Sequence, residues 1–355
     1  MAKIVQIDDK YENKAVVEKI ARLFQSGNIN FLIGSGASSP VIETAGNIES
    51  EIDKEFAEGN EFAAIEQLYN FILNLLTSNK SLLETRDLED TNNKTVKALI
   101  HYKMFLSNIE NILLKRRTNL LPKQANIYTT NYDVFIERAA EASSTSILND
   151  GFVRTPNLIE KPKFSPQSFF NSTFNNGHLF NYKVEIPTIN LLKIHGSLTW
   201  SREQNDIVSE LNYSNPISKE KLTKENMSHF VSKFALVLPR KDKHQETLLD
   251  RVYYEMLRIF SNELDKENTA LFVFGFSFAD EHILDITKRA LKNPTLQLVI
   301  FCYCELDAQS MIKKFESFNN VTILKPAENE FIEFDTFNEY LSCIFDTMEG
   351  HSNAT

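Results

Sequence analysis

The amino-acid sequence predicts an α/β fold built on a doubly wound, mostly parallel sheet. Short apolar runs recur along the chain with helical patterns between them, and strands that alternate with helices build parallel sheets. Residues 269–274 (Thr-Ala-Leu-Phe-Val-Phe) are apolar almost throughout, as expected of a strand that is covered on both faces. The strands predicted in this way are residues 30–33, 125–129, 189–194, 234–239, 269–274, 296–301 and 321–324.

Apolar residues at helical spacing fill the stretches between these strands. One helix, over residues 16–24, leads into the first strand. Two long helical patterns, at residues 62–76 and 99–113, follow that strand, so we expect a helical subdomain inserted over residues 47–122. A last helix is expected at residues 330–348.

Two further insertions have a different character. Residues 143–187 are rich in Asn, Ser, Phe and Pro, and we expect an irregular excursion that packs onto the body through its phenylalanines. Residues 201–233 form a polar insertion. Because every insertion interrupts the same strand–helix pattern, we treat residues 1–355 as one large domain.

The composition narrows the classes of function. A formal net charge of −10 argues against direct binding of nucleic acid by a broad basic surface. The three cysteines, Cys302, Cys304 and Cys343, suit a reducing cytosol and offer no four-thiolate zinc site. The first residues lack the apolar core of a signal peptide, and no apolar run is long enough to span a membrane. We therefore expect a cytoplasmic protein without a membrane segment.

The first predicted strand ends in Gly34-Ser35-Gly36-Ala37-Ser38. Two glycines one residue apart after a strand are typical of a turn that brings backbone N–H groups close to a pyrophosphate. The full dinucleotide fingerprint would place a third glycine three residues after Gly36, where this chain has Ser39. The same stretch also fits an ordinary loop between a strand and a helix.

Polar side chains that can do chemistry follow two later strands. Thr130-Asn131-Tyr132-Asp133 comes directly after the second predicted strand, although Asn131 or Asp133 could instead cap the helix that follows. His195 comes directly after the third predicted strand and precedes Gly196. Open α/β sheets bind their ligands at the carboxyl ends of their strands, so these positions are candidates for a site.

Four stretches together resemble the motifs of the sirtuin superfamily, in the order in which that superfamily carries them. They are residues 34–38 (Gly-Ser-Gly-Ala-Ser), 129–133 (Thr-Thr-Asn-Tyr-Asp), 193–197 (Lys-Ile-His-Gly-Ser) and 275–277 (Gly-Phe-Ser). The resemblance implies a Rossmann-like core that binds NAD. It implies that Asn131 holds the nicotinamide ribose or the attacking water, and that His195 is the catalytic histidine. The NAD-binding residues that it implies are Gly34, Ser35, Gly36, Ala37, Ser38, Thr130, Asp133, Gly275 and Ser277.

The chain departs from the protein-deacylating sirtuins in a region that bears on function. Those enzymes carry four zinc-binding cysteines shortly after the His-Gly motif, whereas residues 201–233 contain no cysteine. The zinc-free pattern with helical insertions is similar to the sirtuin-like effectors of bacterial anti-phage systems. That resemblance implies an NAD glycohydrolase, without zinc, that forms nicotinamide and ADP-ribose in abortive infection. The alternatives are a nucleotide sensor without turnover and an NAD-dependent protein deacylase.

The resemblance also implies partners. Similar stand-alone chains work beside a HerA-type DNA-translocating ATPase or a short Argonaute-type protein, and we expect the HerA type first. The acidic net charge suggests that the partner, and not this chain, contacts nucleic acid. The apolar stripe of the helical insertion, with Phe62, Tyr69, Tyr102 and Phe105, also predicts a homo-oligomer, with packing inside the chain as the alternative.

Overall fold

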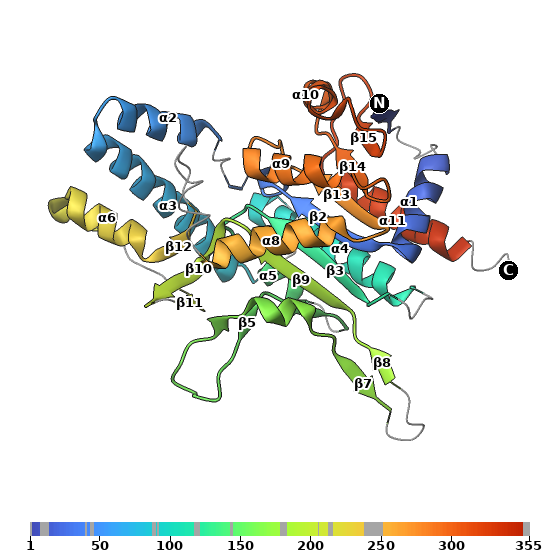
Figure 1. The fold of residues 1–355 in the computed structure, drawn as a ribbon. Helices are drawn as coiled ribbons and strands as arrows, with labels where there is room; N and C mark the ends of the chain where they lie inside the picture. The colour runs from blue at the N-terminus through green and yellow to red at the C-terminus, as the bar shows by residue number, and fades with distance from the viewer. Residues whose placement is uncertain are drawn as a thin grey trace.

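A parallel sheet forms the centre of the structure, which is a computed structural model of the chain (Figure 1). Its strands are, from one edge to the other, β1 (Lys3–Gln6), β15 (Val321–Lys325), β14 (Gln297–Phe301), β13 (Thr269–Phe274), β2 (Asn28–Ile33), β3 (Gln124–Thr129), β9 (Thr188–Lys193) and β4 (Ile147–Asn149). Every neighbouring pair is parallel, which confirms the predicted fold class. The structure describes residues 2–7, 14–39, 41–42, 46–86, 90, 92–116, 121–142, 145–177, 183–204, 206–211, 216–237 and 251–350.

Helices cover both faces of this sheet, because its strands carry apolar side chains on both. Three helices lie on one face: α1 (Lys14–Ser26), α4 (Lys94–Leu114) and α11 (Phe334–Gly350). Three others cover the opposite face: α8 (Arg251–Asp265), α9 (Glu281–Ala290) and α10 (Glu305–Phe315) (Figure 1). Neighbouring residues of β2, Phe31 and Leu32, therefore belong to two separate core clusters. Among the described residues, no helix is both long and apolar enough to cross a membrane.

Among the described residues, three α-helices lie between β2 and β3, where the sequence predicted two. The additional helix, α2 (Gly46–Ala57), was missed because only Ile48, Ile52 and Phe56 mark its apolar face. It packs against α3 (Glu61–Glu84), whereas α4 lies directly on the sheet.

The aromatic stripe that suggested a homo-oligomer is covered mainly within the chain. Tyr69, Tyr102 and Phe105 are all buried, and the ring of Phe105 lies 5.2 Å from that of Phe31 in the sheet. Of the four side chains in the stripe, only Phe62 is exposed, at 49%. Because α4 packs on the sheet, the aromatic stripe is no evidence for contact with a second copy of the chain. Oligomerisation stays a prediction.

A second, antiparallel sheet lies beside the first. Its strands are, in order, β12 (Phe234–Leu236), β10 (Gly196–Glu203), β11 (Asp206–Ser209), β6 (Lys163–Phe164) and β5 (Phe152–Val153). The prediction that residues 234–239 continue the parallel sheet is wrong for the described part, because β12 pairs with β10. The helix α6 (Lys224–Ser232) precedes β12.

The excursion at residues 143–187 is more regular than the sequence suggested. It contributes the edge strand β4, two strands of the second sheet, and the hairpin of β7 (Phe174–Asn176) and β8 (Lys183–Glu185). The expected packing onto the body holds for part of its phenylalanines: the rings of Phe152 and Phe164 lie 5.3 and 5.6 Å from that of Trp200. Phe170 and Phe174 are exposed.

Four asparagine side chains form a hydrogen-bonded ladder across the main sheet. Asn30, Asn126, Asn190 and Asn149 stand in register on β2, β3, β9 and β4. The amide nitrogen of Asn126 donates to Asn30 (2.9 Å), that of Asn190 to Asn126 (2.9 Å), and that of Asn149 to Asn190 (3.0 Å). The side-chain oxygens of Asn30, Asn126 and Asn190 thus each accept a hydrogen bond from the neighbouring strand. These bonds can form only when the strands are in this register.

We predict that Asn126→Ala lowers the free energy of unfolding by roughly 2–4 kcal/mol, because it leaves polar atoms of both neighbouring asparagines without their partner. The free energy would be measured by urea unfolding followed by circular dichroism. As a control, Asn175→Ala removes an exposed asparagine on β7 and should change the value by no more than about 0.5 kcal/mol. Equal effects of the two substitutions would contradict the ladder as a stabilising element.

Candidate functional site

The strand order reverses direction between β2 and β13. From β2 the chain proceeds to β3 and β9 on one side, and it returns to build β13, β14 and β15 on the other. Such a switch point leaves a crevice at the carboxyl ends of the two strands. A cavity of about 850 Å³ opens there, walled by the segments that follow β2, β3, β9, β13 and β14.

Two glycine-containing loops touch at this switch point. The N–H groups of Gly34 and Gly36 donate to the carbonyl oxygens of Phe274 and Gly275, both at 3.0 Å. A Cβ atom on Gly34 would lie 2.2 Å from the Gly275 oxygen, and one on Gly275 would lie 2.6 Å from the nitrogen of Ala37. The absence of a side chain is therefore required by the contact between the loops.

The sequence predicted that these glycines let a pyrophosphate approach the backbone; this stays a prediction, and the structure adds the contact between the two loops as a further reason for the glycines. The N–H group of Gly36 donates to Gly275, that of Ala37 to Gly34 (3.1 Å), and that of Ser38 to Ser35 (3.1 Å). These three donors are already used within the protein. A bound phosphate would need other donors or a rearrangement of the turn, in which residues 35–37 form a short 3₁₀ helix.

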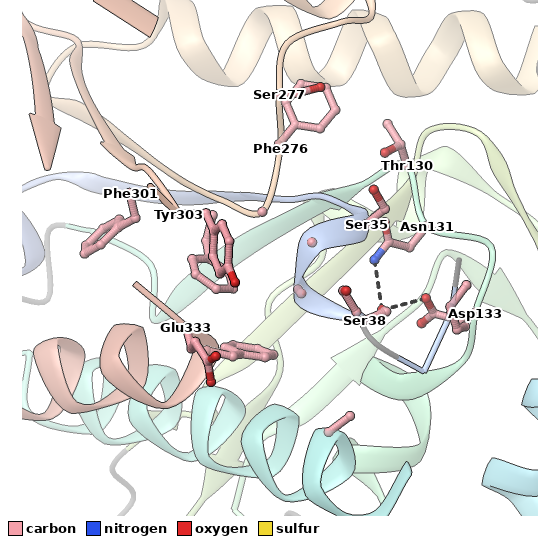
Figure 2. Close-up of a pocket in the computed structure, with 18 of the residues that line it drawn as sticks. Ser35, Ser38, Thr130, Asn131, Asp133, Phe276, Ser277, Phe301, Tyr303 and Glu333 are labelled. Carbon is pink, nitrogen blue, oxygen red and sulfur yellow. Dashed lines mark hydrogen bonds between the residues drawn. The ribbon is translucent and has the colours of Figure 1, made fainter. Parts of the chain in front are cut away.

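Asn131 links the end of β3 to the glycine turn. Its amide nitrogen donates to the carbonyl oxygen of Gly34 at 3.1 Å. The same nitrogen donates to the hydroxyl of Ser38 at 3.2 Å (Figure 2). Because a carbonyl oxygen can only accept, the nitrogen must face Gly34, and the amide oxygen of Asn131 points the other way. That oxygen is buried and has no hydrogen-bond partner in the described part of the chain. A buried acceptor without a donor in the wall of a cavity fits a ligand hydroxyl or a bound water.

Asp133 lies beneath Ser38 and accepts hydrogen bonds with both oxygens. Ser38 donates to one oxygen at 2.8 Å (Figure 2). The N–H group of Phe135 donates to the other oxygen at 3.2 Å. Asp133 therefore has both predicted roles. It accepts a hydrogen bond from the first turn of the next helix, and it lines the cavity. Burial raises the pKa of Asp133, while the nearby charge of Lys193 and the bond from Ser38 oppose that rise.

Tyr102 of α4 completes this hydrogen-bond chain. Its hydroxyl lies 2.8 Å from that of Ser38. Burial raises the pKa of Tyr102 well above its ordinary value, so the hydroxyl keeps its proton at neutral pH. Since the single proton of Ser38 is directed to Asp133, Tyr102 is the donor to Ser38.

A buried ion pair supports the loop that carries Asn131 and Asp133. The ammonium group of Lys193, at the end of β9, lies 2.8 Å from the carboxylate of Glu137. It also donates to the backbone oxygen of Asp133 and, at 3.0 Å, to the hydroxyl of Ser197. Lys193 thereby joins the ends of two neighbouring strands.

His195 faces a residue that the sequence analysis missed. Its Nε2 atom lies 3.1 Å from an oxygen of Asp280, and the two side chains are only 13% and 8% exposed. The other oxygen of Asp280 accepts from the N–H groups of His282 and Ile283 at the start of α9. An aspartate before a helix predicts such a cap. No sequence pattern, however, indicates that this turn reaches His195.

The comparison with known proteins agrees with this geometry. A family model described as the SIR2-like domain matches residues 125–324. The chain belongs to the SIR2-like family. A search of curated proteins found no match. The matched range begins at β3, so residues 34–38 lie outside it, and their place in the site rests on the contact between the two loops.

The SIR2-like assignment fits an NAD-related enzyme, and the cavity contains nearly all the residues that the sequence predicted. Every predicted site residue lines it except Gly34, whose carbonyl oxygen meets Asn131. Thr130, Asn131 and Asp133 lie at one end in Figure 2. Phe301, Tyr303 and Glu333, which were not predicted, lie at the opposite end of the cavity in Figure 2. Phe276 and Asp307, also not predicted, line the cavity as well. In the described part of the chain, no group of three or more His, Cys, Asp or Glu side chains is placed to hold a metal ion.

The loop contact of this SIR2-like core can be tested with two glycines that share a backbone conformation. Gly275 (φ +64°) is packed against the other loop, whereas a Cβ atom on Gly59 (φ +79°) would have nothing within 4 Å. We predict that Gly59→Ala costs roughly 1–2 kcal/mol of unfolding free energy from backbone strain alone. Gly275→Ala should cost a further 1–3 kcal/mol or so, because the added methyl group forces the loops apart. Denaturant unfolding measures both, and equal losses would show that the loop contact is not close-packed.

Proposed function

We propose that this protein hydrolyses NAD to nicotinamide and ADP-ribose. The observation that supports the proposal best is the pairing of two strand ends. Thr129 and Lys193 are register partners on β3 and β9, and Asn131 and His195 each follow two residues later. Asn131, whose buried amide oxygen has no partner among the described residues, and His195 thus line the same cavity at the ends of neighbouring strands.

The chemistry of NAD hydrolysis needs few groups. Nicotinamide leaves a pyridinium as a neutral base, so its departure requires no general acid. The protein must stabilise the oxocarbenium-like ribose and deliver a water molecule to it, as in glycoside hydrolysis. The free oxygen of Asn131 suits a ribose hydroxyl or the attacking water, and His195 suits acceptance of the proton from that water.

The cavity supports this proposal by its size and by its burial. A volume of about 850 Å³ lies within the range of roughly 300–1,000 Å³ that is usual for small-molecule and cofactor sites. Asn131 and Asp133 are both buried, so polar interactions with a substrate there would be stronger than in water. The resemblance to anti-phage effectors leads us to propose that this hydrolysis depletes NAD in infected cells.

We predict that Asn131→Ala and His195→Ala each lower the rate of nicotinamide release by roughly 100-fold or more. Release would be followed by chromatography of NAD incubated with the purified protein and whatever partner it needs for activity. His229→Ala is the matched control, since His229 is exposed on α6 and lies outside the cavity lining. Wild-type rates in both site variants would refute the assignment. NAD that is bound in calorimetry and recovered unchanged would indicate a sensor instead of a hydrolase.

We also propose that a separate protein controls the activity, because a free NAD hydrolase would deplete its own cell. Within the described residues, α11 is not a separate sensor: Phe337 and Leu341 are buried in the same core cluster as the sheet. The resemblance favours a HerA-type ATPase as the partner, with a short Argonaute-type protein as the alternative.

Addition of the partner with DNA should raise nicotinamide release by roughly tenfold or more, as a coupling free energy of 1–3 kcal/mol would produce. The measurement compares the isolated chain with the mixture at equal concentration. Full activity of the isolated chain at cellular concentration would contradict control by a partner.

A further inference from the structure

His195 and Asp280 meet across the carboxyl edge of the sheet. Their loops follow β9 and β13, which are separated by β3 and β2 in the strand order. The two side chains nevertheless approach to 3.1 Å, and both line the cavity. The backbone at His195 is also fixed, because its carbonyl oxygen accepts a hydrogen bond from the N–H group of Val237 at 2.9 Å.

The contact determines which imidazole nitrogen carries a proton. Asp280 precedes α9, and the positive end of that helix favours an ionised carboxylate. An ionised carboxylate can only accept hydrogen bonds, so the Nε2 atom of His195 must carry the proton in the contact. In the neutral ring, Nδ1 is then left with a lone pair.

We propose that Asp280 is the positioning residue of this site: it holds His195 in the tautomer whose Nδ1 atom can accept a proton from the attacking water. The proposal rests on the proposed NAD hydrolysis. In the step itself, the water proton moves to Nδ1 as the water oxygen bonds to the ribose carbon, and the bond from that carbon to nicotinamide breaks. The imidazolium that forms is stabilised by the neighbouring carboxylate.

Capping of α9 does not account for both oxygens of Asp280. One oxygen accepts from His282 at 3.1 Å and from Ile283 at 3.2 Å, which satisfies the start of the helix. Asparagine and serine supply an equivalent cap with a single oxygen. The second carboxylate oxygen, which meets His195, serves a separate purpose.

This division of roles gives a substitution that separates structure from positioning. In Asp280→Asn the amide oxygen can keep the helix cap while the amide nitrogen faces His195. An amide nitrogen only donates, so the Nε2 atom would become an acceptor and the proton would move to Nδ1. The fold is retained, and the nitrogen needed for catalysis is blocked.

The tautomer can be measured without any turnover. Nitrogen-15 chemical shifts of histidine side chains report which nitrogen of the neutral imidazole ring carries the proton. The His195 signal is identified by its loss in His195→Ala. We expect protonated Nε2 in the wild type and protonated Nδ1 in Asp280→Asn. Protonated Nδ1 in the wild type, or no change in the variant, overturns the proposal whether or not the protein hydrolyses NAD.

Kinetics provide the second test. The turnover number of Asp280→Asn should fall by roughly 10²–10⁴-fold, while KM for NAD stays within about threefold. In a His195→Ala background the same substitution should cause no further loss, because Asp280 acts through His195. Glu281→Gln is the matched control: it removes a charge from the same helical turn at an exposed residue outside the cavity lining, and its activity should be unchanged.

Three other kinetic results would contradict the proposal. Activity within threefold of the wild type, a loss that persists in the His195→Ala background, or a loss of NAD binding would each show that Asp280 does not act by positioning His195. A wild-type protein that releases no nicotinamide even with its activating partner would refute the proposed function, and the tautomer measurement would still decide the pairing of His195 with Asp280.

Discussion

The backbones of two loops touch where the sheet changes direction, and the groups around the cavity take their positions from that contact. Gly34 and Gly275 allow it because neither presents a Cβ atom to the other loop. The loop that begins at Gly275 ends at Asp280, the cap of α9. Lys314 of α10 fixes it between these points by donating to the backbone oxygens of Ser277 and Phe278 at 2.6 and 3.1 Å. A shift of this loop would therefore change both ends of the cavity.

The polar groups at the strand ends are satisfied almost entirely by one another. Tyr102, Ser38 and Asp133 form a chain of hydrogen bonds, and Asn131 joins that chain through its nitrogen. In a low-dielectric interior such a network is stable only when its donors and acceptors are matched, and a buried acceptor left over costs roughly 1–3 kcal/mol. The oxygen of Asn131 carries this penalty in the protein alone. A ligand that donates to it would recover that free energy on binding.

The sequence predicted the parallel core well, because strands covered on both faces have an unmistakable apolar composition. The sequence also predicted that Asn131 and His195 lie at the carboxyl edge of the sheet, because both closely follow such strands. The sequence could not reveal Asp280 as the neighbour of His195, because their contact depends on the path of a loop across two intervening strands. The edge strands β1 and β4 have too few residues to show a pattern, and β12 looked like a core strand because its side chains are as buried as those of the main sheet.

The asparagine ladder aligns the two strands that lead to Asn131 and His195. Asn131 follows Asn126 by five residues along β3, and His195 follows Asn190 by five along β9. Because the ladder aligns the two asparagines across the strands, equal spacing places Asn131 and His195 the same number of residues beyond one aligned pair. A deletion of one residue between rung and loop would displace the side chain by about 3.3 Å and turn it to the opposite face. An insertion or deletion between Asn126 and Asn131, or between Asn190 and His195, would therefore displace a residue of the cavity. The insertions at residues 143–187 and 201–233 each begin only after one of these two segments.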